Sequence, residues 1–270
     1  MYLPSKVVID VSEDAEYVSF CHKIKDFLQI DLLEYKENQM KRRLKSLYEK
    51  RGFSDFQTYY KHIVADESIR LEFLDRITIN VSEFFRNYPR WQVLEKDILP
   101  QLLKENRPLK VWSAACSSGE EPYTLAMILS RFLPLERIQI LATDIDEKIL
   151  AKAKSGVYNE YAIKGCPEAY FKKFFTQKDG QYVISNDIKS CVTFKKQNLL
   201  NDMFDTNYDL IVCRNVMIYF TEDAKEKLYR KFSAALKENG IFFVGSTEQI
   251  FQPQNYSFVT EKTFFYKKER

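Results

Sequence analysis

Apolar residues recur with a helical period between residues 20 and 80, and nothing in this stretch alternates as a strand would. The clearest stripe repeats at i, i+4, i+7 and i+8 and consists of Met40, Leu44, Leu47 and Tyr48. Residues at that spacing share one face of a helix, so we expect this face to be buried. Gly52 fits the end of the helix, because glycine adopts the backbone conformation that often follows a last turn.

Two further helices follow in the same stretch. Ser54 and Asp55 fit the start of one, whose apolar face consists of Phe56, Tyr59, Tyr60 and Ile63. The other is predicted from Asp66 to Thr78. We therefore expect a small all-helical domain over residues 20–75. Residues 1–19 lack a strong period, and we expect them to form a leader.

After Pro108, short apolar runs alternate with helical stretches. Strands are predicted at residues 109–113 and 138–143, and buried strands at residues 192–196, 208–213 and 241–245. Helices are predicted at residues 121–132, 147–154 and 223–237, the last with Thr221 as N-cap and Asn239-Gly240 as its stop. Strands alternating with helices predict an α/β fold with a parallel, doubly wound sheet.

Residues 156–190 break this alternation. They are rich in aromatic and turn residues, and Asp179-Gly180 stands between two candidate strands. An Asp-Gly pair in that position is typical of a β-hairpin. We expect a small β-subdomain inserted at about residues 156–190 of the α/β domain.

Composition narrows the class of protein. The chain has 270 residues, of which 45% are hydrophobic and 29% charged, which is typical of a soluble globular protein. No apolar run approaches the ~20 residues that span a bilayer, and the start shows no signal-peptide pattern. Five cysteines without a CxxC pair and only two histidines favour a cytoplasmic protein with reduced thiols, without a metal site or a histidine-based triad.

The net charge of +3 is too small to indicate a nucleic-acid-binding protein. The basic excess is concentrated between Glu34 and Arg51, where basic residues clearly outnumber acidic ones. Lys41, Arg42 and Lys45 project from faces of the predicted helix other than its apolar stripe. This face is either a solvated surface or a docking site for an acidic partner.

The turn after the first predicted strand, residues 113–122, occupies the place where open α/β sheets bind ligands. A pyrophosphate site requires G-x-G-x-x-G, but Ala114 and Cys116 stand at the first two glycine positions. Glu120 and Glu121 at the helix start would repel a phosphate. The turn therefore argues against NAD or ATP and allows a cationic nucleoside such as S-adenosylmethionine. Alternatively, the two glutamates only complement the helix dipole.

Polar residues follow the other predicted strands. Asp144 follows the second strand, where it could bind ribose hydroxyls or cap the next helix. Asn198 follows the third strand. Arg214, Asn215 and Tyr219 follow the fourth strand, so their polar groups could reach the same site. Alternatively, Arg214 forms a structural ion pair and Tyr219 is a packed aromatic ring. Before the α/β domain, the polar residues Asn80, Ser82 and Arg86 could contribute to the site or belong to a capped helix start.

These motifs together resemble a known family. The matching pieces are Asn80-x-Ser82-x-Phe84-Phe85-Arg86, Val111-Trp112-Ser113-Ala114-Ala115, Gly119-Glu120-Glu121-Pro122-Tyr123, Asp144-Ile145-Asp146, Asn198-Leu199-Leu200 and Cys213-Arg214-Asn215-Val216-Met217-Ile218-Tyr219-Phe220. In their order and spacing, the sequence is similar to the chemotaxis receptor glutamate O-methyltransferases, the CheR family. The resemblance covers about residues 25–266.

The resemblance implies a Rossmann-like class I methyltransferase domain over residues 91–270, preceded by a helical receptor-recognition domain. Residues 76–90 would link the two and contribute to the cofactor site. It implies S-adenosylmethionine as methyl donor and glutamates in the cytoplasmic helical domain of chemotaxis receptors as acceptors. The cofactor contacts would be Asn80, Ser82, Arg86, Glu121, Asp144, Asn198, Leu199, Arg214 and Asn215. Arg86 and Tyr219 match residues near the methyl group, and Lys41, Arg42 and Lys45 match the receptor-reading helix.

Two departures from the family pattern change the expectation. Ser82 stands where threonine is common, which keeps the hydroxyl. The hairpin around Lys178-Asp179-Gly180-Gln181 is shorter than in members that grip a peptide at the receptor's C-terminus. We therefore expect a tether-independent enzyme. We also expect it to be a monomer of the cytoplasm that is recruited to receptor arrays.

The expected chemistry needs no general base, because a glutamate side chain with a pKa near 4.3 is already ionised at neutral pH. We expect Arg86 to be shared with Glu121 or the cofactor carboxylate, and Tyr219 to donate a hydrogen bond or line the methyl path. A methyltransferase for nucleic acid or a small amine and a non-enzymatic adaptor are the alternatives. The first would carry a Pro-Pro-aromatic motif after the fourth strand, which this chain lacks, and the second would have lost motif residues.

Overall fold

The computed structural model describes residues 11–78, 80–104 and 107–269. The chain divides between residues 79 and 80 into two compact units, which are described separately. Among the described residues, no helix is both long and apolar enough to cross a bilayer.

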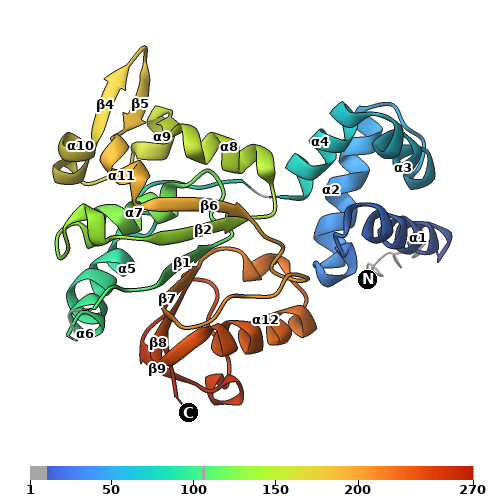
Figure 1. Cartoon of the computed structure of the whole chain (residues 1–270). Helices are drawn as coiled ribbons and strands as arrows, with labels where there is room; N and C mark the ends of the chain where they lie inside the picture. The colour runs from blue at the N-terminus through green and yellow to red at the C-terminus, as the bar shows by residue number, and fades with distance from the viewer. Residues whose placement is uncertain (1–10, 79, 105–106, 270) are drawn as a thin grey trace, which may run out of the picture. The chain divides into compact units, whose positions relative to one another are not determined.

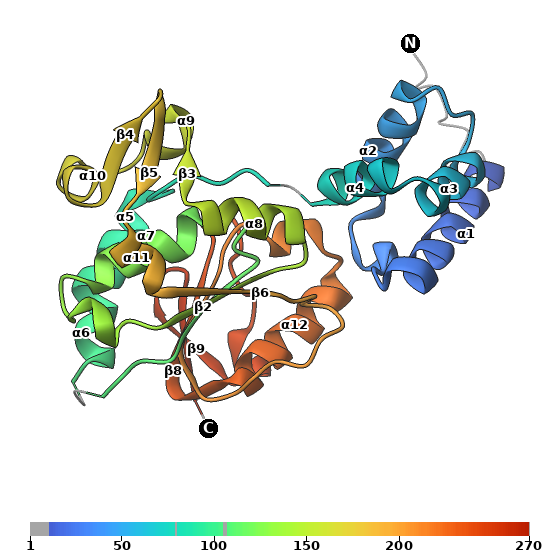
Figure 2. The ribbon, with the colours of Figure 1, turned by 45° about the horizontal axis from the view of Figure 1, so that its top comes forward.

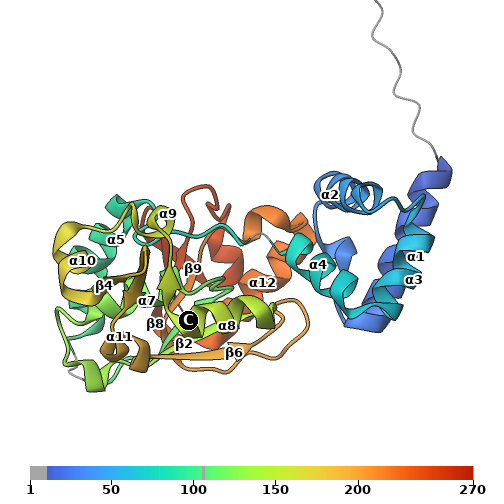
Figure 3. The ribbon, with the colours of Figure 1, turned by 90° about the horizontal axis from the view of Figure 1, so that it is seen from above.

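The first unit is helical, as predicted (Figure 3). Its helices are α1 (Val11–Leu28), α2 (Glu37–Lys50), α3 (Phe56–Ala65) and α4 (Glu67–Ile77), with a 3₁₀ turn at Leu32–Glu34. The predicted apolar stripe of α2 is confirmed, because Met40, Leu44, Leu47 and Tyr48 are all buried. Aspartates cap the next two helices, and the Asp55 side chain accepts a hydrogen bond from the Thr58 N–H at 2.6 Å.

The start of the first unit differs from the prediction. Helix α1 begins at Val11, so the leader predicted over 1–19 is wrong for residues 11–19. Residues 1–10 lie outside the described residues. Tyr17 and Phe20 of α1 are buried, and both rings pack against Phe56 of α3. The helical period of this segment is too weak to predict α1 from sequence, because its buried residues are covered by a ring of α3.

The second unit has a large sheet with the strand order β6-β2-β1-β7-β8-β10-β9 (Figure 1). Its strands are β1 (Val111–Ala114), β2 (Ile140–Asp144), β6 (Val192–Lys196), β7 (Tyr208–Cys213), β8 (Leu236–Val244), β9 (Phe258–Lys262) and β10 (Phe265–Lys268). The first five are parallel to one another, and β10 is antiparallel to both β8 and β9. The predicted parallel sheet is confirmed, and the antiparallel pair extends it.

Helices cover both faces of this sheet. Helices α7 (Glu120–Leu129) and α8 (Glu147–Ser155) lie on one face, and α12 (Glu222–Ala235) lies on the other (Figure 1). The first face is also packed by α5 (Tyr88–Val93), a π-helical turn at Leu94–Ile98, and α6 (Leu99–Leu102). On the other face the Phe232 ring stacks on Phe242 with 4.7 Å between centroids.

Two strands differ from their predictions. Strand β6 forms the edge of the sheet and buries only its first residue, Val192, so its prediction as a buried strand is wrong. Strand β8 begins at Leu236, directly after α12, whereas the pattern places its start at Ile241. Asn239 has a φ of 62° and lies inside the strand's irregular first part, so it does not end the helix. Thr221 caps α12 as predicted, since its side chain accepts a hydrogen bond from the Ala224 N–H.

The β-subdomain is present at residues 156–190 (Figure 2). Its sheet has the order β3-β5-β4, from β3 (Val157–Tyr158), β4 (Phe175–Lys178) and β5 (Gln181–Ile184). Short helices α9 (Glu160–Ile163), α10 (Glu168–Phe174) and α11 (Asn186–Ser190) complete it. The predicted hairpin is confirmed, because Asp179 and Gly180 connect β4 to β5 with φ of 51° and 73°.

Candidate active site

The carboxyl ends of the parallel strands meet at one edge of the large sheet. Glu121 follows β1, Asp144 ends β2, Asn198 follows β6, and Arg214 and Asn215 follow β7. Open α/β sheets bind their ligands at this edge. The structure therefore brings these sequence-predicted residues to one place on the sheet.

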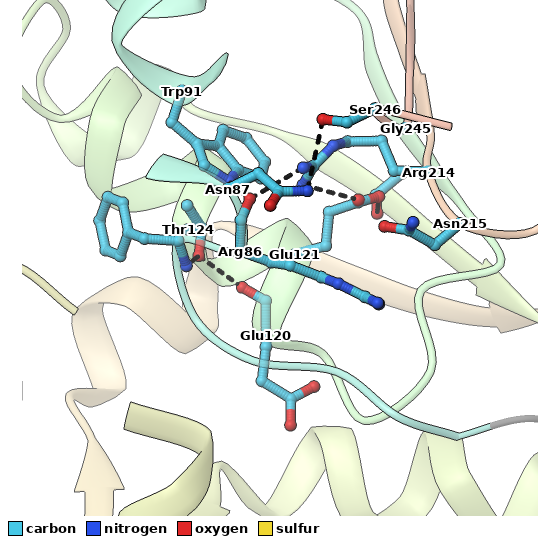
Figure 4. Close-up of polar contacts among 12 residues, drawn as sticks. Arg86, Asn87, Trp91, Glu120, Glu121, Thr124, Arg214, Asn215, Gly245 and Ser246 are labelled. Atoms are coloured by element: carbon cyan, nitrogen blue, oxygen red, sulfur yellow. Dashed lines mark hydrogen bonds and ion pairs between the residues drawn. The ribbon is translucent and has the colours of Figure 1, made fainter. Parts of the chain in front are cut away.

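Glu121 and Arg214 form the charged centre of this edge (Figure 4). Arg214 Nη1 lies 3.8 Å from Glu121 Oε2, and Ser113 Oγ donates to Glu121 Oε1 at 2.9 Å. Burial raises the pKa of Glu121 to about 7, although Arg214 and the Ser113 hydroxyl act in the opposite direction. The neighbouring groups therefore neutralise this carboxylate only partly.

The guanidinium of Arg214 is almost wholly enclosed. It stacks over the rings of Trp91 and Phe243, with 4.9 Å to each centroid, and Nη2 donates to the main-chain carbonyl of Arg86 at 2.8 Å. Burial lowers the pKa of Arg214 from its ordinary value. Both alternatives considered for Arg214 hold in part, since it makes an ion pair and also lies at the candidate site.

Glu120 points away from this centre, although it is the next residue in α7 (Figure 4). Its buried carboxylate accepts hydrogen bonds from Ser118 Oγ at 2.8 Å to both oxygens, and Ser82 donates a further one. Burial raises the pKa of Glu120. Glu120 therefore binds hydroxyls of the chain itself, a role that the sequence motif does not reveal.

Asp144 is buried at the end of β2. Its Oδ2 accepts from the Ser117 N–H at 2.8 Å, and its Oδ1 accepts from the Asp146 N–H at 3.1 Å. Burial raises the pKa of Asp144 to about 6. The alternative role of Asp144 as a helix cap is excluded, because Asp146 caps α8 by accepting from the Lys148 and Ile149 N–H groups.

The turn between β1 and α7 is tightly folded. Ala115 and Ser117 have φ of 58° and 49°, and Gly119 has a φ of 91°. A Cβ at Gly119 would lie 3.0 Å from the Ala153 Cβ and 3.2 Å from the Tyr158 hydroxyl. Glycine is therefore required at this position, while the other two glycine positions of a phosphate loop hold side chains.

The 80–87 segment precedes α5 and reaches the same edge. The Asn80 side chain donates to Asp146 Oδ2 at 3.2 Å and accepts from Ser117 Oγ at 3.1 Å. Arg86 Nη1 donates to the Val81 carbonyl at 3.2 Å, and its charge helps to lower the pKa of Glu121. The sharing of Arg86 with Glu121 or the cofactor carboxylate stays a prediction, while the guanidinium that pairs with Glu121 is that of Arg214.

Asn198 and Leu199 lie in a turn that Lys231 of α12 holds from outside. Lys231 Nζ donates to the carbonyl of Leu199 at 2.6 Å and to that of Asp202 at 2.8 Å. Asn198 Oδ1 accepts from the Leu200 N–H at 3.0 Å. This turn lies beside the end of β2, because Gln197, the residue after β6, donates its N–H to the Asp144 carbonyl at 2.9 Å.

Glu248 is a residue of this edge that the sequence analysis missed. Its buried carboxylate accepts main-chain hydrogen bonds from Asn215 at 2.6 Å, Val216 at 2.7 Å, Gly245 at 2.8 Å and Ile218 at 3.3 Å. Glu248 therefore fixes the segment that carries Asn215 and Tyr219. Tyr219 is half-buried and ends a 3₁₀ turn at Met217–Tyr219. A Cβ at Gly245 would lie 2.4 Å from the carboxylate, so a side chain at this position would displace Glu248.

Comparisons with known proteins agree with this geometry. Residues 15–78 match the model of the CheR methyltransferase all-alpha domain, and residues 80–265 match that of the CheR methyltransferase SAM-binding domain. The chain belongs to the CheR methyltransferase family.

Three relatives of the family are each named "Chemotaxis protein methyltransferase". Those of Listeria innocua serovar 6a and Listeria monocytogenes serovar 1/2a are 42% and 43% identical over 256 residues. In both cases the match covers 94% of this chain and 98% of the relative. The protein of Borreliella burgdorferi is 37% identical over 249 residues, covering 87% of this chain and 88% of the relative. This CheR-family chain thus matches its relatives over nearly their full length.

The residues of this CheR site fit S-adenosylmethionine, the cofactor of the family. Glu121 and Asp144 are buried carboxylates, and burial raises the pKa of each above its ordinary value. A ligand with a cationic end and ribose hydroxyls offers such carboxylates an opposite charge and hydrogen-bond donors. The turn before Glu120 lacks the glycines that a pyrophosphate requires, in agreement with a nucleoside without phosphates. The chain is accordingly an S-adenosylmethionine-dependent methyltransferase.

Proposed function

We propose that the chain transfers a methyl group from S-adenosylmethionine to glutamate side chains of methyl-accepting chemotaxis receptors. The observation that carries the proposal is the charge arrangement at the sheet edge. The buried carboxylates of Glu121 and Asp144 suit a cationic methyl donor, while the guanidinium group of Arg86 suits an anionic acceptor. Both histidines of the chain lie in the first unit, on α1 and α3. A carboxylate acceptor agrees with such a site because it needs no general base.

When bound, S-adenosylmethionine supplies a methyl group on a sulfonium, which an ionised carboxylate can accept without losing a proton. The chain's own residues then act by placement. Arg86 orients the acceptor without holding it too strongly, because Glu121 shares its charge. Tyr219 donates a hydrogen bond or lines the methyl path. Orientation of reactants can lower a barrier by ~7–11 kcal/mol.

The proposed cofactor contacts come from each segment of the edge. Asp144 binds the ribose hydroxyls, and Glu121 and Arg214 face the charged groups of the methionine part. Asn198 and Leu199 lie on the side of the edge strand β6. The full set consists of Asn80, Ser82, Arg86, Glu121, Asp144, Asn198, Leu199, Arg214 and Asn215.

We further propose that the basic side chains of α2 recognise the receptor's cytoplasmic helical domain. Arg42 is exposed, while Lys41 and Lys45 are half-buried, and the Lys41 ammonium lies 5.9 Å from the Tyr17 ring. Arg43 donates to the carbonyls of Arg76 and Ile77 at 3.4 Å, so it serves the fold of the unit. The short hairpin at Asp179 supports an enzyme that does not depend on a receptor tether. We also propose that the chain acts as a monomer in the cytoplasm, at receptor arrays.

The proposal is tested by incubating the chain with S-adenosylmethionine labelled in its methyl group and a purified receptor cytoplasmic fragment. Label on the fragment, suppressed by added S-adenosylhomocysteine, is the expected result. Label on nucleic acid or small amines in place of the receptor would support the first alternative. Binding of the receptor without any transfer would support an adaptor and contradict the proposal.

A further inference from the structure

The 80–87 segment carries Arg86 and is folded against the β-subdomain. The Phe84 N–H donates to the carbonyl of Ala162 in α9 at 2.8 Å. The Phe84 ring meets Tyr158 of β3 and Phe175 of β4 edge-on, with 4.8 and 5.0 Å between centroids. Phe84 therefore belongs to the core of the β-subdomain, although it lies far from that subdomain in the sequence.

The next residue makes a second link to the β-subdomain. Phe85 is almost fully buried, and its ring lies 4.8 Å from that of Tyr170 in α10. Its N–H donates to Thr124 Oγ1 of α7 at 3.2 Å. The main chain at Phe85 is thus held between the β-subdomain and α7.

The backbone at this point is strained. Phe85 has a φ of 55°, a region that bulky side chains adopt rarely and at an energetic cost. Asn87 has a φ of 58°, which asparagine adopts more readily. Such a conformation persists only where the surroundings impose it. At Phe85 the surroundings are Tyr170 and Thr124, which the preceding contacts identify.

The strained segment places Arg86 at the edge of the large sheet where the carboxyl ends of the parallel strands meet. The Arg86 carbonyl, between the two left-handed residues, accepts hydrogen bonds from Trp91 Nε1 at 3.0 Å and from Arg214 Nη2 at 2.8 Å. The β-subdomain also reaches the cofactor turn, since the Tyr158 hydroxyl donates to the Ser118 carbonyl at 2.8 Å. One small unit therefore supports both the turn and the segment that carries Arg86.

We propose that the β-subdomain positions the reaction site, because its contacts with Phe84 and Phe85 set the backbone that directs Arg86. This rests on the proposed function, in which Arg86 lies beside the reacting methyl group. Phe84, Phe85, Tyr158, Ala162 and Tyr170 are positioning residues that act through Arg86. The β-subdomain then has a role in the reaction whether or not it grips a receptor peptide.

Gly165 offers a test from the β-subdomain side. It is exposed, and a Cβ at this position would lie 2.9 Å from the Phe84 carbonyl oxygen. Gly165→Ala therefore pushes on the 80–87 segment without removing any contact of Arg86. Lys164→Ala, at the exposed neighbouring position, is its control.

Phe84→Leu is the second variant, because leucine keeps an apolar side chain but loses the edge-on contacts with Tyr158 and Phe175. Its matched control is Phe258→Leu, a buried ring of β9 that packs against Phe242 and Tyr266. The two leucine variants separate a general loss of stability from a change at Arg86. If Phe84→Leu does not fold, Gly165→Ala decides alone.

Two measurements are made on each variant. The first compares kcat for methylation of a receptor fragment with the affinity for S-adenosylhomocysteine. The second records the NMR signal of the Arg86 Nε–H, assigned with Arg86→Lys. We expect both test variants to lower kcat by roughly 10- to 100-fold, since small misplacements cost that much, and to weaken S-adenosylhomocysteine binding by a smaller factor, because the other cofactor contacts remain in place. The Arg86 signal should move in both test variants and in neither control.

An unchanged kcat and an unchanged Arg86 signal in Gly165→Ala would overturn the proposal. So would an equal loss of kcat in Phe258→Leu or Lys164→Ala. The two proposals fail separately. If the unsubstituted chain methylates no receptor, the proposed function fails, while the movement of the Arg86 signal still decides whether the β-subdomain positions this residue.

Discussion

Arg214 Nη2 donates a hydrogen bond of 2.8 Å to the main-chain carbonyl of Arg86, a residue 128 positions earlier in the sequence. The bond joins the end of strand β7 to the 80–87 segment. Because the same guanidinium faces Glu121 and stacks on Trp91 and Phe243, one side chain connects the parts of the site. The geometry depends on a planar group with several donors, which arginine has and lysine lacks.

Replacing Arg214 with lysine keeps the charge and removes the planar fork. We expect Arg214→Lys to lower the free energy of unfolding by about 2–3 kcal/mol, since a hydrogen bond from a buried charged group is lost. Cofactor affinity should fall as well, because the 80–87 segment is released. Calorimetry and thermal denaturation measure the two effects. Arg230→Lys, an exposed arginine of α12, is the control and should change neither; equal losses in both variants would contradict the account.

The segment after β7 depends on Glu248, whose carboxylate receives main-chain N–H groups from both sides. In Glu248→Gln, the amide NH₂ faces donors and one acceptor oxygen is lost. We expect a loss of about 2–3 kcal/mol in the free energy of unfolding and a fall in kcat. Denaturant titration and methylation assays measure these effects. Glu226→Gln on the exposed face of α12 should leave both unchanged, and an unaffected Glu248→Gln would remove the positioning role.

Much of the architecture was predictable from local pattern. The stripe at Met40, Leu44, Leu47 and Tyr48 predicts its own burial, and Asp179-Gly180 predicts its hairpin, because neighbours in the sequence decide both. Glu248 was not predictable as a site residue, since its partners are main-chain N–H groups. The links from Phe84 and Phe85 to rings of the β-subdomain are likewise non-local.

The pKa values of two buried carboxylates predict how cofactor binding depends on pH. Burial raises the pKa of Glu121 to about 7 and that of Asp144 to about 6, and the ionised forms attract a cationic ligand. Affinity for S-adenosylmethionine should therefore rise as pH increases from 6 to 8 and then level off. About a tenth of Glu121 is ionised one unit below its pKa, so its ionisation should raise the affinity roughly tenfold between pH 6 and 8.

Titration calorimetry at several pH values measures this dependence. Glu121→Gln should reduce the rise to about twofold, the part that Asp144 contributes. Glu226→Gln, which removes an exposed carboxylate, should keep the full rise. A pH dependence that survives unchanged in Glu121→Gln would assign it to a different group.

The basic face of α2 predicts a salt-sensitive encounter with the receptor. Reversing Arg42 and Lys45 to glutamate should slow receptor methylation by roughly 10- to 100-fold at low salt, because complementary charges steer association. Cofactor affinity and melting temperature should stay nearly unchanged. Reversal of Lys23 and Lys61, on α1 and α3 of the same unit, is the control. Methylation that survives the Arg42 and Lys45 reversal would place the receptor elsewhere.

The stability of the transferred methyl group shows whether the acceptor is a carboxylate. Receptor fragment labelled by the chain is treated with mild alkali, and the volatile label is collected. An ester releases its methyl group as methanol under these conditions, whereas a methylated amine keeps it. The account predicts that the label on the receptor is released as methanol. Label that remains on the protein after alkali would contradict it.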